Sequence, residues 1–225
     1  MIVFIYGSDT YRSRGYLRHQ IDEFKKKRDP GGFNISMIDF EEMPEEEAWA
    51  QIFAAPFLAE KRMSVMMNVV ATSEEFKNKL TGAIVAGKAP EDNIWVIWER
   101  ELPKEKEKEP AQNALIKVLK KGKFVKELGE LFGREFADWI EEEARLAGGK
   151  IERQAAEYLA ENATDTWHAL SVVNQSIAFS AGREGGTGAT VVGLKDVQEF
   201  LDAKIDDNIF HLVDAVIAGR GQDVF

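Results

Sequence analysis

The sequence contains no cysteine. Disulfides, thiolate zinc sites and cysteine nucleophiles are therefore excluded, and a reducing cytosol is compatible with this composition. No run approaches the roughly 18 apolar residues of a membrane-spanning helix, and the amino terminus, MIVFIYGSD, has no basic segment typical of a signal peptide. We expect a soluble, cytoplasmic protein with no membrane partner.

Positive charge is outnumbered by negative charge. The 29 Lys and Arg residues face 39 Asp and Glu residues, which gives a formal net charge of -10. Such a chain has no global attraction to nucleic acid or anionic lipid, so any connection to DNA must be local or pass through a partner. A length of 225 residues with 44% apolar residues predicts one or two globular domains.

Apolar runs alternate with helical stripes in the first 130 residues. Strands are expected at residues 2–6, 34–40, 63–70, 93–98 and 123–126. Helical spacing, as at Leu17, Ile21 and Phe24, separates these runs. The alternation predicts a doubly wound α/β domain with a parallel sheet.

Beyond residue 130 the pattern indicates helices only. One stripe is expected to bury the residues Trp167, Leu170, Asn174, Ile177 and Ala178. A small bundle fits residues 150–204, a glycine-rich linker occupies 182–188, and a further helix with an apolar side starts at Asn208.

The first predicted strand ends where a nucleotide-binding α/β protein would carry its phosphate loop. Gly7-Ser8-Asp9-Thr10 lacks the lysine and the length of a Walker loop, and it places a carboxylate where phosphate would lie. We interpret Asp9 as a helix N-cap and expect no nucleotide and no other cofactor.

No chemical motif is apparent elsewhere. His19, His168 and His211 lie in separate helical patterns, so we expect no metal site. Glu99, at the end of a buried strand, is the one candidate acid, but it has no partner base or nucleophile in the pattern, and we expect no catalytic residue.

One local stretch is rich in lysine. We interpret it as a solvated helix surface, and binding of DNA phosphates is the alternative. Its members are Lys117, Lys120, Lys121, Lys123 and Lys126.

Two large apolar residues, Phe57 and Leu58, sit in the connection between a short helical pattern and the third strand. Connections usually run over the surface and are polar. Either both side chains fold inward as core, or they form a protruding plug that enters a pocket on a partner.

Several segments in a fixed order resemble the delta-subunit family of bacterial DNA polymerase III, the wrench of the clamp loader. They read YGSDTY, AAPFLAEKRMSVMMN, NIWVIWE, FADWIEEEARLAGGKI and NIFHLVDAVIAGR. The resemblance implies an AAA+ (P-loop NTPase-like) domain without a working Walker loop at 1–145, a three-helix lid at 146–205 and the start of a helical collar at 206–225. It also implies that ATP hydrolysis belongs to neighbouring subunits.

The resemblance further implies that an apolar pair inserts into a pocket of the beta sliding clamp and favours ring opening, for loading onto primed DNA in replication. The residues at these positions are Phe57 and Leu58, supported by Pro56, Ala59, Lys61 and Arg62. Other loader subunits would be contacted through the collar, and DNA only indirectly.

Two features depart from the family pattern. Val173 to Ile177 replaces the charged segment usual in the third lid helix, and the collar pattern stops after its first helix, so we expect a truncated fragment. The alternative function is a nucleotide-dependent α/β enzyme with a divergent phosphate loop.

Overall fold

The computed structural model describes residues 1–104, 109–183 and 190–202, and it divides the chain into two compact units after Glu130. This boundary precedes the one expected at residue 145. The reason is that α5 (Gly133–Leu146) buries Phe136 and Ile140 in the core of the second unit. The collar segment expected at 206–225 lies outside the described residues.

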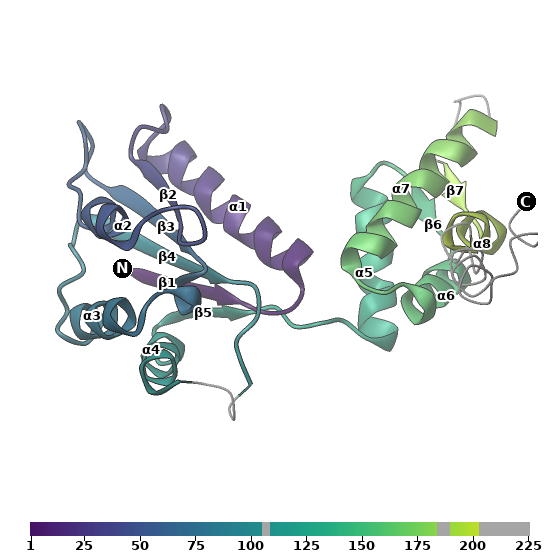
Figure 1. Ribbon diagram of the computed structural model, residues 1–225. Coiled ribbons are helices and arrows are strands. Elements are labelled where there is room, and N and C mark those ends of the chain that lie inside the picture. Colours follow the sequence, from purple (N-terminus) through teal and green to yellow (C-terminus); the bar gives the residue numbers. More distant parts are fainter. Residues whose placement is uncertain (105–108, 184–189, 203–225) are drawn as a thin grey trace, which may run out of the picture. The chain divides into compact units, whose positions relative to one another are not determined.

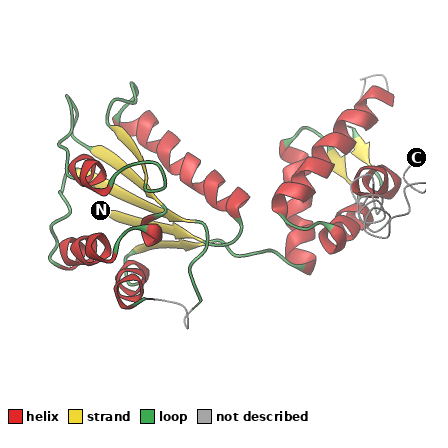
Figure 2. Ribbon diagram, in the orientation of Figure 1, coloured by secondary structure: helices red, strands yellow, loops and turns green. Residues whose placement is uncertain are grey.

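The first unit is built on a parallel sheet of five strands, which confirms the α/β prediction (Figures 1 and 2). Its strands are β1 (Ile2–Tyr6), β2 (Ile35–Asp39), β3 (Arg62–Met67), β4 (Asn93–Glu99) and β5 (Phe124–Glu127). Their order in the sheet is β2-β3-β4-β1-β5. Because the strands are parallel, the loops that precede β2 and β3 lie at the same end of the sheet, where Ile35 pairs with Met63.

Helices cover both faces of this sheet, as the buried apolar strands require. On one face α1 (Thr10–Arg28) packs Leu17 and Phe24 against Val3, Val65 and Val96. The other face is covered by α2 (Glu45–Ile52), α3 (Glu74–Val85) and α4 (Pro110–Lys120). A short 3-10 helix, η1 (Val69–Ala71), follows β3.

The second unit is mainly helical. After α5 come β6 (Lys150–Ile151), α6 (Arg153–Asn162), α7 (Thr166–Arg183), β7 (Val191–Val192) and α8 (Leu194–Asp202). The expectation of helices only is wrong in one respect, since β6 and β7 form a two-stranded parallel pair. Within the described ranges, no helix is long and apolar enough to cross a membrane.

The buried side of α7 also differs from the predicted stripe. Trp167 is 48% exposed and Asn174 is exposed, whereas the buried residues are small: Ala169, Val172, Val173 and Ser176. Small side chains let α7 approach α5 closely, and the larger residues therefore remain at the margin.

Candidate protein-docking site

The connection between α2 and β3 leaves and rejoins the sheet at fixed points. The Ile52 carbonyl at the end of α2 accepts hydrogen bonds from Asn93 Nδ2 at 2.8 Å and from Trp95 Nε1 at 3.2 Å. Both donors are buried side chains of β4. At the other end, the Arg62 amide donates to the Asp92 carbonyl at 2.8 Å. Residues 54–61, which we call the docking loop, therefore extend from a rigid base.

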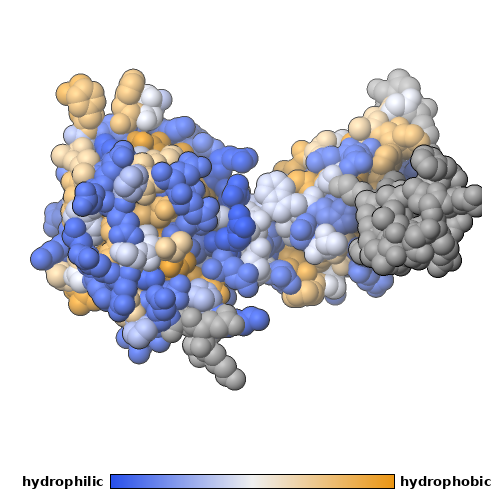
Figure 3. All heavy atoms as spheres, viewed as in Figure 1, coloured by the Kyte–Doolittle hydropathy of each residue, from blue (hydrophilic) through white to orange (hydrophobic). Residues whose placement is uncertain are grey.

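Phe57 and Leu58 lie at the tip of the docking loop and face solvent. Their side chains belong to residues that are 64% and 92% exposed, so the interpretation of the pair as core is wrong. Figure 3 shows hydrophobic atoms projecting from the end of this unit where β2 and β3 begin. Two adjacent exposed apolar residues on a braced loop are typical of a contact with another protein.

A buried amide holds the loop at its tip. Asn34, 2% exposed, accepts a hydrogen bond from the Phe57 amide through Oδ1 at 2.6 Å and donates to the Phe57 carbonyl through Nδ2 at 3.0 Å. Asp29, also buried, accepts from the Asn34 amide at 2.7 Å and from Asn34 Nδ2 at 3.3 Å. The Asp29–Asn34 pair thus satisfies both backbone groups of Phe57 and fixes where its side chain starts.

Leu58 has a backbone angle φ of 50°, in the left-handed region. A residue with a Cβ pays roughly 1–2 kcal/mol for this conformation, which glycine adopts freely. Strain of this kind persists where the surroundings impose it and occurs often at functional sites. Here it turns the most exposed large apolar side chain of the loop outward.

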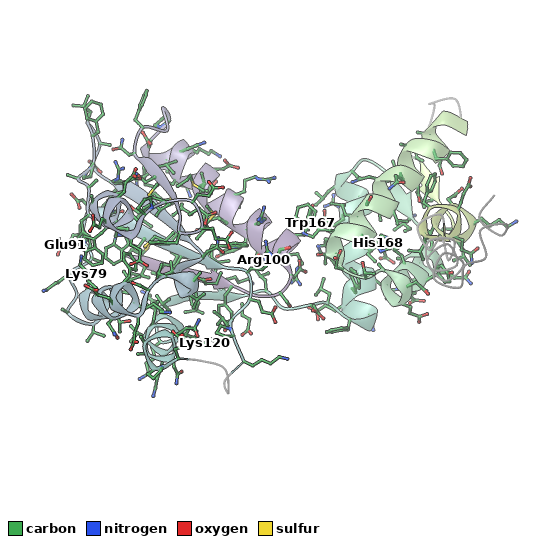
Figure 4. The ribbon with its side chains drawn as sticks, viewed as in Figure 1. Lys79, Glu91, Arg100, Lys120, Trp167 and His168 are labelled. Atoms are coloured by element: carbon green, nitrogen blue, oxygen red, sulfur yellow. The ribbon has the colours of Figure 1, made fainter. Side chains whose placement is uncertain are left out.

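The four supporting positions behave differently from the pair. Pro56 and Ala59 are half-buried at the flanks of the tip. Lys61 Nζ donates to the carbonyl of Glu91, a residue labelled in Figure 4, at 2.7 Å, and the Arg62 guanidinium donates to Ser36 Oγ. Lys61 therefore braces the loop against its own unit, whereas Arg62 links β3 to β2 at the base of the loop.

The turn after β1 packs closely against the backbone of the segment that follows β5. An ideal Cβ on Gly7, whose φ is 141°, would lie 2.0 Å from the Leu128 carbonyl oxygen. The Asp9 amide donates to the same carbonyl at 3.1 Å, and the Asp9 side chain accepts from the Arg12 amide at 3.0 Å. The amino end of α1 is thus occupied by the protein's own carboxylate, as the N-cap prediction requires.

Glu99 is buried at the end of β4, and its Oε1 accepts a hydrogen bond from the Val70 amide at 3.0 Å. Burial raises the pKa of this carboxyl to about 8, against the lowering effect of the backbone hydrogen bonds. The bond to Val70 places the side chain at η1, so the geometry gives Glu99 a structural role.

The histidines lie on separate parts of the chain. His19 lies on α1 of the first unit and His168 on α7 of the second, while His211 is outside the described residues. In residues 1–104, 109–183 and 190–202, no group of three potential metal ligands is found.

Several lysines of the basic stretch cover aromatic rings of the same chain. Lys120 Nζ, on α4 in Figure 4, lies 4.6 Å from the centroid of Tyr6, and Lys126 Nζ lies 5.9 Å from that of Tyr16. These contacts favour the surface interpretation, and lysines on and beside β5 also protect this edge strand from pairing with other chains.

The sequence did not reveal Asp29 and Asn34 as site residues, or the 76% exposed Phe33 next to Asn34. Asp29 reads as the end of a helix and Asn34 as the start of a strand. A possible signal is that a polar residue opens a buried strand, where its side chain must find partners.

No family model matches the chain. The Bacillus subtilis (strain 168) protein DNA polymerase III subunit delta is 26% identical over 226 residues, which cover 95% of this chain and 60% of that protein. The chain therefore spans about three fifths of the length of that curated relative.

Solved structures share the fold. The Bacillus subtilis DNA clamp loader delta protein matches with a TM-score of 0.54 and 23% identity, over 99% of this chain and 64% of that chain. The Thermotoga maritima RuvB Holliday junction branch migration motor matches with a TM-score of 0.61 and 14% identity, over 97% and 70%. Domain III of the Thermotoga maritima replication initiation protein DnaA matches with a TM-score of 0.56 and 13% identity, over 91% and 85%. The first unit thus shares the parallel-sheet fold of these structures.

Proposed function

We propose that this chain, which is similar to the DNA polymerase III subunit delta of Bacillus subtilis, acts as a clamp-loader subunit that binds the beta sliding clamp through Phe57 and Leu58. One observation carries the proposal. The pair is exposed at the tip of a loop that Asn34 holds by two hydrogen bonds. An anchor that is already ordered loses little conformational freedom on binding, and this favours affinity.

In the proposed mechanism the two side chains fill an apolar pocket on the ring-shaped clamp. A ligand shifts a conformational equilibrium only by the difference between its affinities for the two states. The pair would therefore open the ring by binding more tightly to the pocket shape of an open or strained ring than to that of a closed one.

The proposed subunit performs no chemistry of its own. The Gly7 turn and the Asp9 cap support this, because they occupy the place where an AAA+ ATPase would bind phosphate. ATP hydrolysis would then belong to neighbouring subunits, contacted through the collar expected at 206–225. DNA would be reached indirectly, in the cytoplasm, with the helical second unit, which includes α5, serving as the lid.

The test is direct. The sliding clamp of the source organism is labelled with a dye pair across one ring interface, and the chain is titrated into it. We expect saturable binding together with a fluorescence change that reports separation of that interface. Binding without separation would remove ring opening from the proposal, and no binding by the folded chain would remove clamp recognition altogether.

A further inference from the structure

We propose that Phe33 is a third apolar anchor of the surface formed by Phe57 and Leu58, and that it contacts the same protein partner. This inference rests on the proposed function, because the partner is the clamp. Phe33 is 76% exposed and lies in the turn between α1 and β2. Single exposed apolar residues are common and need no explanation, so the argument depends on whether Phe33 is joined to the pair.

The turn and the docking loop are tied together through Asn34. This residue follows Phe33 directly, and its side-chain amide bonds both backbone groups of Phe57, at 2.6 and 3.0 Å. A second link lies beside the first, since Arg28 Nη1 is 3.4 Å from Glu60 Oε2. Two apolar tips held by a buried amide and flanked by an exposed ion pair match the anatomy of an interface, with an apolar centre and a polar rim.

The turn also holds the Phe33 ring outward. The Gly32 amide donates to the Asp29 carbonyl at 2.9 Å, and Gly32 has a φ of 73°, which closes the turn. An ideal Cβ on Gly31 would lie 2.5 Å from Cε2 of Phe33, so the ring lies against the bare backbone of that glycine. Phe33 is therefore supported from below and presented to solvent, as Phe57 and Leu58 are.

The partner follows from continuity with the proposed interface. Asn34 hydrogen-bonds Phe57 directly and follows Phe33 in the chain, so the turn that carries Phe33 is bound to the loop that carries Phe57, and we expect a partner surface that receives Phe57 to meet this turn as well. Adjacent anchors that are desolvated together usually contribute to one interface, and the losses of binding free energy when they are mutated are not additive.

The experiment measures clamp affinity by calorimetry for the full chain and for Phe33→Ala, Phe33→Leu and Phe132→Ala. Phe132 is the matched control, because it is 72% exposed and belongs to the second unit and not to the unit that carries the docking loop. We expect Phe33→Ala to weaken binding at least about tenfold. Phe33→Leu should retain most of the affinity, and Phe132→Ala should change it less than about twofold by the same criterion for hot spots.

The outcomes are distinguishable. If the wild-type chain binds and Phe33→Ala, with an unchanged circular dichroism spectrum, binds equally well, the third anchor is refuted while the proposed function stands. If the wild-type chain does not bind, both proposals are refuted. Non-additive losses in a Phe33→Ala, Leu58→Ala cycle would support a shared contact surface, and strictly additive losses would contradict it.

Discussion

Replacing Asn34 by alanine should both destabilise the first unit and release the docking loop. The substitution removes three side-chain hydrogen bonds, two to Phe57 and one to Asp29. At a net contribution of about 1 kcal/mol each, the free energy of unfolding should fall by about 3 kcal/mol. Part of this loss is local, because the amide and carbonyl of Phe57 can form hydrogen bonds with water once the loop opens.

Two assays separate the global effect from the local one. Urea unfolding gives the loss of stability, and limited digestion with chymotrypsin, which cleaves after large apolar residues, reports opening of the loop at Phe57 and Leu58. We expect faster cleavage there in Asn34→Ala at urea concentrations far below the unfolding midpoint. Asn113→Ala, on an exposed position of α4, is the control and should leave both readouts unchanged. An Asn34→Ala variant with wild-type stability and wild-type cleavage would refute the bracing role of the amide.

Three further predictions concern the rest of the first unit. Gly7→Ala should strongly lower the yield of folded protein or its melting temperature, because the new Cβ would lie 2.0 Å from the Leu128 carbonyl oxygen; a melting temperature equal to wild type would contradict this packing. The pKa of Glu99 is about 8 in the folded protein and 4.5 ordinarily, so the folded state holds an extra proton in this window and wild-type stability should fall as pH rises from 4.5 to 8. Glu99→Gln should remove this decline and be more stable than wild type at pH 8 but not at pH 4.5; parallel pH profiles of the two proteins would count against the buried neutral carboxyl. Millimolar ATP with magnesium should leave the melting temperature unchanged, because only a real site gives a concentration-dependent shift, and such a shift would favour the nucleotide-dependent alternative.

Much of the first unit could be predicted from the sequence, because buried parallel strands such as residues 93–98 are continuous apolar runs. The same rule could not place Phe57 and Leu58, since composition does not distinguish a core residue from a presented one. Asn34 was missed because it hydrogen-bonds Phe57, 23 residues further along the chain, and Asp29 was missed because its role is to bond Asn34. In the second unit, β6 and β7 have two residues each, too few to produce a pattern. The buried face of α7 was predicted wrongly because its buried residues are small, whereas Trp167 and Asn174, which were expected to be buried, are exposed.

The central claim is that Phe57 and Leu58 serve binding and not folding, and one double variant tests it. The double variant Phe57→Ala, Leu58→Ala removes side chains that are largely exposed. Its free energy of unfolding should therefore differ from that of wild type by no more than about 1 kcal/mol. Loss of a true hot spot costs at least about 2 kcal/mol of binding free energy, which corresponds to about 30-fold in affinity. Because at least one of the two anchors should be such a hot spot, affinity for the clamp should fall by more than about 30-fold. Urea unfolding and calorimetric clamp binding, measured on the same preparation, give both quantities. A folded variant that no longer binds is the predicted result, whereas a variant that unfolds, or one that binds as well as wild type, would contradict the account.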